Sequence, residues 1–292
     1  MLNTSPHTGG SRKRPENRQP PLVSIVTVCY HAGESLPATI ASVEAQTCSD
    51  YEFIVVDGGS GDRTLEVLRS SDAHIDHWIS APDKGIYDAM NKGAEMATGT
   101  YLAFLNADDR YAPDTIAQVQ HALQSDRPDV LHGNMIKVRL LDGNIFERLE
   151  KPQPELMPQG MGIFHPATFV KRDVFAAAGG YDTAYKLAAD YALFLKLWQE
   201  GKRFVHLDVP LAYFSLGGAS NAGCETYREA IRIQSIHRTG YQRRTWLLWW
   251  KCRMKRWARQ AVISLAHATG TTALLNRKVQ KRWDSPSEKP GS

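Results

Sequence analysis

The fold is decided by the stretch Leu22-Val23-Ser24-Ile25-Val26-Thr27-Val28, which is rich in apolar and β-branched residues. Such a run is typical of a strand that is buried on both faces of a sheet. Apolar residues at helical spacing follow over residues 35–46, and residues 53–56, Phe-Ile-Val-Val, predict a second buried strand. Together these segments predict a strand–helix–strand unit with parallel strands.

The same alternation continues along the chain. We expect a helix over residues 64–69, a short strand over 77–80, a helix over 87–97 and an apolar strand over 101–105. Past Pro113 the pattern changes to a helix at 115–123, a short strand at 130–132, a hairpin over 135–149, an extended segment at 164–170 and helices at 172–178 and 190–200. The prediction is an α/β fold around a mostly parallel sheet.

Charge is unevenly distributed, although the formal net charge is only +4. Residues 22–229 carry 17 basic and 28 acidic side chains, whereas residues 230–283 carry 13 basic side chains and no acidic one. We therefore expect an acidic body with a basic C-terminal arm. With 42% hydrophobic and 23% charged residues in 292, the composition excludes a wholly disordered chain and predicts one large domain or two modest ones.

The ends of the chain and its cysteines carry further expectations. Residues 1–21 are polar and rich in Pro, Ser, Arg and Asn, which predicts a disordered leader and not a secretory signal. No run of 18 apolar residues occurs, so a conventional membrane-spanning helix is not expected. Cys29, Cys48, Cys224 and Cys252 form no C-x-x-C pair and are expected to be free thiols in a reducing compartment.

Acidic residues follow the predicted strands at three places. Asp57 ends the second strand, Asp108-Asp109 follows the strand at 101–105, and Asp83 lies between them in the chain. Any one of them alone is best explained as a cap of a turn or helix, but three in succession at one sheet edge favour a polar ligand site. Glycine-rich phosphate-binding loops are missing, and carboxylates suit a divalent cation that bridges protein and diphosphate.

Seven short motifs follow one another along the chain: residues 24–30 (SIVTVCY), 55–60 (VVDGGS), 83–93 (DKGIYDAMNKG), 104–109 (FLNADD), 165–169 (HPATF), 179–182 (GGYD) and 189–193 (ADYAL). In order and spacing they resemble those of the family 2 inverting glycosyltransferases, most closely the branch that assembles bacterial polysaccharides and glycolipids. The likeness ends near residues 214–220 (FSLGGAS) and so covers about residues 22–220. Each motif alone is weak evidence for the family, whereas seven motifs in the family's order are strong evidence.

The resemblance implies the GT-A fold, which binds nucleotide sugars. It implies that the backbone at residues 27–30 lines the base, that Asp57 hydrogen-bonds the base, typically uracil, and that Lys84 faces the diphosphate. The implied substrate-binding residues are Thr27, Cys29, Tyr30, Asp57, Asp83, Lys84, Asn91 and His165. For His165 a site role and a packing role carry equal weight.

The same resemblance implies a metal and a base. Asn106-Ala107-Asp108 lies at the family's metal-binding D-x-D, so Asp108, Asn106 and Asp109 would hold Mg²⁺ or Mn²⁺. Asn106 replaces the usual first aspartate, and a neutral amide is a weaker ligand. Asp190 falls where the family places its catalytic base, although it also starts a predicted helix and could serve as an N-terminal cap.

The basic arm is a predicted amphipathic helix. Residues 243–259 contain seven cations and four tryptophans, and at about 100° per residue Leu247, Trp250, Met254 and Trp257 share one face. This composition favours an anionic membrane surface as the partner of residues 240–265. Packing of the tryptophans on the catalytic domain is the second interpretation, and nucleic-acid binding is disfavoured.

The sequence thus predicts a leader at 1–21, a GT-A domain at 22–229 and a basic helical extension at 230–292. The expected enzyme transfers a sugar from a nucleotide-sugar donor to a glycan or lipid-linked acceptor, on the cytoplasmic face of the cell membrane. One alternative is a catalytically degenerate transferase fold that acts as a membrane-bound assembly partner, which Asn106 motivates. Another is a nucleotide-sugar nucleotidyltransferase, although the Gly- and Arg-rich signature of that class is absent.

Overall fold

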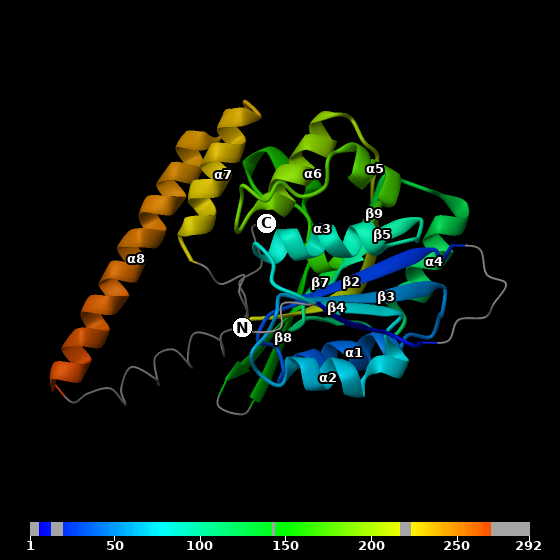
Figure 1. Cartoon of the computed structure of the whole chain (residues 1–292). Coiled ribbons are helices and arrows are strands. Elements are labelled where there is room, and N and C mark those ends of the chain that lie inside the picture. The colour runs from blue at the N-terminus through cyan, green and yellow to red at the C-terminus, as the bar shows by residue number, and fades with distance from the viewer. Residues whose placement is uncertain (1–5, 13–19, 142–143, 217–222, 270–292) are drawn as a thin grey trace.

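The computed structural model describes residues 6–12, 20–141, 144–216 and 223–269, with residues 259–269 described by backbone alone. Its centre is a ten-stranded sheet in the order β1-β4-β3-β2-β5-β9-β7-β10-β6, with β8 paired to β7 (Figure 1). The strands are β1 His7–Gly9, β2 Val23–Cys29, β3 Tyr51–Asp57, β4 His77–Ser80, β5 Tyr101–Phe104, β6 Arg110–Tyr111, β7 Val130–Leu141, β8 Asn144–Glu150, β9 Thr168–Lys171 and β10 Phe204–Ser215. The helices are α1 Leu36–Glu44, α2 Thr64–Ser70, α3 Ile86–Met96, α4 Thr115–Ser125, α5 Arg172–Ala177, α6 Ala189–Gln199, α7 Glu225–Ile236 and α8 Gln242–Thr269, and 3₁₀ turns lie at η1 Asp72–His74, η2 Pro154–Gln159 and η3 His165–Ala167.

The strands that carry or precede the first four motifs form a parallel part of the sheet. Strands β4, β3, β2 and β5 run parallel, whereas β9 pairs antiparallel with β5 and β7. The predicted α/β class is confirmed. Because the four central strands run the same way, their carboxyl ends meet at one edge, which is where the loops after β2, β3, β4 and β5 begin.

Helices cover both faces of the sheet because β2 and β3 send alternate side chains to opposite sides. Ile25 and Phe53 belong to the core beneath α1, α2 and α4, whereas their neighbours Val26 and Ile54 belong to the core beneath α3, α5 and α6. Figure 1 shows α3, α5 and α6 on one side of the sheet and α1 and α2 on the other. Burial on both faces explains the continuous apolar runs at residues 22–28 and 53–56.

Two expectations about the ends of the domain are corrected. Residues 7–9 form β1, which pairs antiparallel with β4, so part of the expected leader belongs to the sheet; residues 1–5 and 13–19 lie outside the described residues. The Asp72 carboxylate helps to hold β1 because it accepts a hydrogen bond from the Gly10 backbone N–H at 2.7 Å. Helix α7 begins at Glu225 and spans the expected boundary at 229/230, so the helical extension starts earlier than predicted.

The expectation of four free thiols is wrong for one pair. Cys224 and Cys252 form a disulfide, although 28 residues separate them, because α7 and α8 pack side by side and bring the two Cα atoms within 5.7 Å. Cys29 and Cys48 are free. Closing a loop of this length contributes about 3 kcal/mol to stability. The bond therefore fastens the basic helix α8 to α7.

The disulfide predicts how many free thiols the protein contains before and after reduction. We expect thiol titration of the denatured, non-reduced protein to find two thiols, and four after reduction. Cys252→Ser should speed amide hydrogen exchange along α8 while exchange in β2 and β3 stays unchanged, because only the tether of α8 is lost. Cys48→Ser, at a free cysteine, is the matched control. Four thiols before reduction would contradict the pairing.

A buried histidine, His132, makes stability depend on pH. His132 of β7 lies directly opposite His206 of β10, with ring centroids 5.3 Å apart, and its Nδ1 has no hydrogen-bond partner among the described residues. Burial, and secondly His206, lowers the pKa of His132 to about 4. The unfolded chain therefore binds this proton more readily, so the stability that neutral His132 contributes is complete above about pH 6.5 and is lost as pH falls toward 4.

His132→Phe retains a ring and removes the titration. We expect the difference in unfolding free energy between wild type and variant to shift by about 3 kcal/mol in the variant's favour between pH 7 and pH 4. Urea unfolding at pH 7, 5.5 and 4 measures it, with the exposed His121→Phe as the matched control. Parallel pH dependence of the wild type and His132→Phe would contradict the assignment.

Candidate active site

The loop after β3 is organised by Asp57, which is fully buried. Its carboxylate accepts hydrogen bonds from the Ser60 backbone N–H at 3.0 Å, from the Ser60 hydroxyl, and from the Ser80 hydroxyl at 2.6 Å. Cys29 donates its thiol to the same carboxylate at 3.7 Å, and burial, followed by the charge of Asp57, raises the pKa of that thiol well above its usual range. Asp57 thus ties together the ends of β2, β3 and β4.

Above this buried layer lies an exposed aromatic ring beside a carboxylate. A Cβ added to Gly58 would lie 2.6 Å from Asp83 Oδ2 and 3.3 Å from Tyr30 Cδ2, so these two side chains meet over Gly58. Tyr30 is 65% exposed, whereas Thr27 is fully buried. Of the residues expected to bind the nucleotide sugar at this edge, Tyr30 therefore presents an exposed side chain and Asp83 a half-buried one.

Helix α3 begins at the loop that contains Asp83 and Lys84. The Asp83 carboxylate accepts the Gly85 backbone N–H at 2.8 Å, and the Lys84 backbone N–H donates to Asp88 at 3.0 Å. The Lys84 side chain is exposed. Asn91, further along α3, uses its amide to hold the backbone of Tyr181 through bonds of 2.8 and 2.9 Å. In this structure Asn91 therefore positions a neighbouring loop.

Oxygen atoms without partners gather at the loop after β5. Among the described residues, Asn106 Oδ1 and Asp109 Oδ2 are buried with no hydrogen-bond partner. Burial raises the pKa of Asp108, and burial together with the charge of Asp108 raises the pKa of Asp109 well above its usual range. Asp109 also accepts the Ser215 backbone N–H through Oδ1 at 3.1 Å, which joins this loop to β10.

This donor set fits a hard divalent cation, which prefers carboxylate and amide oxygens and would relieve the repulsion between two neighbouring carboxylates. The fit rests on two acids and one amide, since the described part of the chain has no cluster of three or more His, Cys, Asp or Glu that could hold a metal. Asn106 also lines the cavity that contains Asp190, which places the metal candidate beside that cavity.

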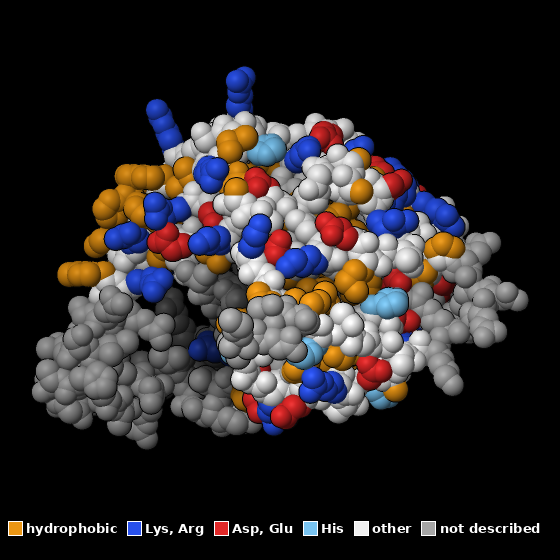
Figure 2. Space-filling view, in the orientation of Figure 1, with side chains coloured by type: hydrophobic (Ala, Val, Ile, Leu, Met, Phe, Trp, Pro, Cys, Tyr) orange, Lys and Arg blue, Asp and Glu red, His pale blue; other side chains and the backbone are white. Residues whose placement is uncertain are grey.

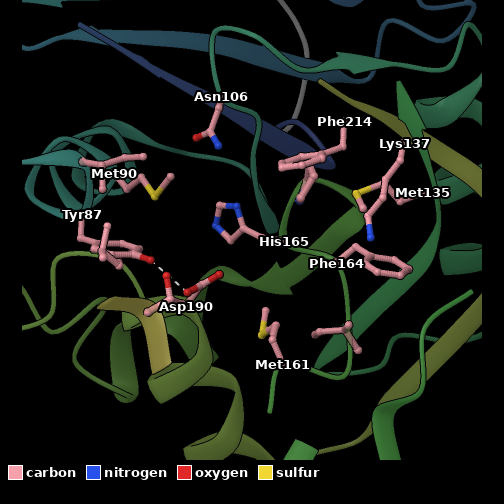
Figure 3. A pocket seen from close by; sticks show the side chains of 15 residues that line it. Tyr87, Met90, Asn106, Met135, Lys137, Met161, Phe164, His165, Asp190 and Phe214 are labelled. Carbon is pink, nitrogen blue, oxygen red and sulfur yellow. Dashed lines mark hydrogen bonds between the residues drawn. The ribbon is translucent and has the colours of Figure 1, made fainter. Parts of the chain in front are cut away.

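Asp190 lies in a cavity of about 300 Å³ between the sheet and α3, α6 and α7 (Figure 3). It is in the first turn of α6, but no side chain caps this helix, so the expected capping role is not seen. Asp190 Oδ1 instead accepts the Tyr87 hydroxyl at 2.9 Å. Burial, followed by the charge of Asp190, raises the pKa of Tyr87 beyond its ordinary range, so Tyr87 stays a donor.

His165 lies in the same cavity, between Asp190 and the opposite wall. Its Nε2 is 2.9 Å from the Tyr181 hydroxyl, and its ring stacks on Phe104 at 5.8 Å. Burial lowers the pKa of His165, which keeps the ring neutral. His165 therefore packs against Phe104 and also lines the cavity, so the structure is compatible with both of its expected roles. Sequence reasoning missed Tyr87 and Tyr181, although both lie inside the quoted motifs.

Comparison with known proteins identifies the family to which this chain is similar. The model of the family described as Glycosyl transferase family 2 matches residues 24–177. A "PGL/p-HBAD biosynthesis glycosyltransferase" of Mycobacterium bovis is 32% identical over 218 residues, which cover 69% of this chain and 80% of that protein. An uncharacterized glycosyltransferase of Mycobacterium tuberculosis is 34% identical over 182 residues, covering 60% of this chain and 68% of the relative.

Solved structures show the same fold. S. aureus TarS 1-349 in complex with UDP superposes with a TM-score of 0.59 at 16% identity, over 73% of this chain and 64% of that one. The same protein in complex with UDP-GlcNAc gives a TM-score of 0.60 at 15% identity, over 73% and 65%. The architecture is that of the GT-A fold, and the chain belongs to glycosyl transferase family 2.

Proposed function

We propose that this chain is an inverting glycosyltransferase that moves a sugar from a nucleoside diphosphate donor, such as a UDP-sugar, to a hydroxyl of a glycan or lipid-linked acceptor. The proposal is carried by Asp190, a carboxylate at the wall of a cavity with one oxygen fixed by Tyr87. TarS, which shares the fold, has been solved with UDP and with UDP-GlcNAc, and this supports a nucleotide-sugar donor.

The reaction is a single displacement. The acceptor oxygen bonds to the anomeric carbon while the bond from that carbon to the diphosphate breaks, and the acceptor proton passes to Asp190. The Tyr87 hydroxyl holds the Asp190 carboxylate in place, and Tyr30 with Asp83 provides the surface for the nucleoside. Lys84, exposed at the start of α3, would face the diphosphate. Asp108 and Asn106 would hold a bound Mg²⁺ or Mn²⁺. The metal ion would neutralise the negative charge that develops on the leaving diphosphate.

Asn106→Asp tests the metal assignment. A further carboxylate replaces the unpartnered amide oxygen, so we expect the Mn²⁺ concentration for half-maximal activity to fall about tenfold. The measurement is activity against free Mn²⁺ in a metal buffer, with Asn144→Asp, at an exposed position on β8, as the control. An unchanged or weaker Mn²⁺ requirement would contradict Asn106 as a ligand.

The proposed function is tested by the product released. A panel of nucleotide sugars is incubated with Mn²⁺ or with EDTA, and nucleoside diphosphate and pyrophosphate are both measured. Metal-dependent release of nucleoside diphosphate supports the transferase. Pyrophosphate release from a nucleoside triphosphate and a sugar phosphate would point to a nucleotidyltransferase, and nucleotide binding with no turnover would point to the degenerate fold.

We also propose that α8 attaches the enzyme to an anionic membrane surface. Trp246, Trp250 and Trp257 are 49%, 43% and 67% exposed, which argues against packing on the catalytic domain, whereas Trp249 is half-buried. The contacts of α8 with α7 include Thr245, which is buried and donates to Gln234 at 2.7 Å, and Cys252, which forms the disulfide. Figure 2 shows apolar and basic side chains intermixed over this part of the surface.

The charges of α8 match this partner. Arg243, Lys251 and Lys255 are exposed beside the tryptophans, and each contributes about 1 kcal/mol near an anionic bilayer. Within the described residues no helix is both long and apolar enough to cross a membrane. We place the enzyme on the cytoplasmic face of the cell membrane. Because disulfides are rare in reducing compartments, we expect Cys224 and Cys252 to be thiols in protein trapped with acid inside cells and to be paired in the purified, oxidised protein; two free thiols in the trapped protein would oppose this location.

A further inference from the structure

The cavity that contains Asp190 has two walls of different polarity. Figure 3 shows Tyr87 and Asp190 on one side, Phe164, Phe214 and Met135 on the other, and His165 between them. The apolar lining as a whole comprises Ile86, Met90, Met135, Met161, Ile163, Phe164, Leu187 and Phe214. A site for a bare sugar is expected to offer many free hydrogen-bonding groups, and on this wall the Lys137 amine stands among apolar side chains.

The polar groups of the cavity are largely engaged already. The Tyr87 hydroxyl donates to Asp190, and His165 Nε2 is bonded to the Tyr181 hydroxyl. Lys137 Nζ lies 3.6 Å from Glu150 on the neighbouring strand β8. Apart from Asn106 and Thr226, which also line the cavity, few donors or acceptors remain to replace the water around several sugar hydroxyls, and burying such hydroxyls without partners would cost free energy.

The apolar side chains, in contrast, leave surface that a ligand could cover. Met161, Phe164 and Phe214 are only half-buried and face the cavity from two separate elements, the segment before η3 and strand β10. Two aromatic rings and flexible methionines adapt to flat or chain-like apolar groups. Covering this surface removes apolar area from water and so favours binding.

We propose that the cavity binds an acceptor whose reacting sugar hydroxyl lies next to an aryl or alkyl aglycone, with the hydroxyl at Asp190 and the aglycone against Met161, Phe164 and Phe214. This inference rests on the proposed function, since it assigns the acceptor of that same site. It narrows the acceptor class from glycans in general to glycosides that carry an apolar group close to the reacting sugar.

The test compares phenyl, octyl and methyl glycosides of the same monosaccharides, each with the donor that gives the fastest nucleoside diphosphate release. We expect kcat/KM to be at least 30-fold higher for the phenyl or octyl glycoside than for the methyl glycoside. Phe214→Gln and Met161→Gln should each lower kcat/KM for the apolar glycoside about tenfold and change the methyl value less than threefold. Leu149→Gln, at an exposed position of β8, is the matched control.

The outcomes separate the two claims. Equal kcat/KM for methyl and apolar glycosides, in an enzyme that turns over, overturns the aglycone inference and leaves the transferase function standing. A wild-type preference that survives both cavity variants also overturns it, because the preference would then arise elsewhere. Loss of donor turnover with every acceptor and with none, by the folded wild type, counts against the proposed function itself.

Discussion

Asp190→Asn is expected to lower kcat at least 100-fold and to leave the dissociation constant of UDP unchanged within threefold. Asparagine has the same shape and can still accept the Tyr87 hydroxyl, so the cavity should keep its geometry. It cannot take the proton of the acceptor hydroxyl, and positioned bases contribute about 10²- to 10⁴-fold to rate. Steady-state kinetics and calorimetric titration of UDP measure the two quantities.

Two further variants sharpen this prediction. Tyr87→Phe removes only the hydrogen bond to Asp190, so kcat should fall about tenfold, less than for Asp190→Asn. Asp173→Asn changes an exposed aspartate in the first turn of α5, the matching place on another helix, and should leave kcat unchanged. Turnover by Asp190→Asn within threefold of the wild type would contradict the assignment of Asp190 as the base.

The second large effect concerns the attachment surface on α8. The triple variant Arg243→Gln, Lys251→Gln, Lys255→Gln removes three exposed charges. At about 1 kcal/mol each, their loss should weaken partitioning onto anionic vesicles by roughly 100-fold or more. Flotation with vesicles of phosphatidylglycerol and phosphatidylcholine measures it. Binding by the wild type should also weaken as salt rises, because screening reduces the charge term.

The apolar part of this surface has its own variant. Trp246→Ser, Trp250→Ser, Trp257→Ser removes three exposed rings and should abolish flotation at physiological salt. The control carries three charge losses on the catalytic body, Arg69→Gln, Arg127→Gln, Lys186→Gln, and should float like the wild type. Flotation of both α8 variants at wild-type levels would refute the membrane proposal.

The sequence is most informative where burial dictates residue type. Strands β2, β3 and β5 are buried on both faces, so their apolar runs could be predicted as strands without knowledge of the segments that pack against them. The acids that follow them were expected at one sheet edge, and the parallel register of β2, β3 and β4 brings Asp57 and Ser80 together there. The local sequence was sufficient here because the acidic residues come directly after the strands in the chain.

Features that depend on distant partners could not be predicted. Residues 7–9, His-Thr-Gly, carry no strand pattern, and only their pairing with β4 makes them a strand. The disulfide joins two cysteines of unremarkable spacing that meet because α7 packs on α8. The helical pattern of residues 243–259 shows two faces but cannot show that Thr245 and Cys252 are the residues that contact α7.

The cavity is another feature that depends on residues distant in the chain. Its lining comes from α3, β7, β10, α6 and the segment before η3, and no single stretch of sequence reveals that Met135, Phe164 and Phe214 face the same space as Asp190. The expected base could be placed from its motif, whereas Tyr87, which holds it, lies 103 residues away in the chain. Residues 217–220 of the last quoted motif lie outside the described residues.

The central claim is that sugar transfer is a single displacement in which Asp190 takes the proton of the acceptor hydroxyl. Proton NMR of the product from the first active donor and acceptor pair tests it most directly, because the anomeric coupling constant reports the new linkage. An α-linked nucleotide sugar should yield a β-linked product that forms with the wild type and not with Asp190→Asn. An α-linked product would contradict the account, since retention requires two displacements or a different mechanism.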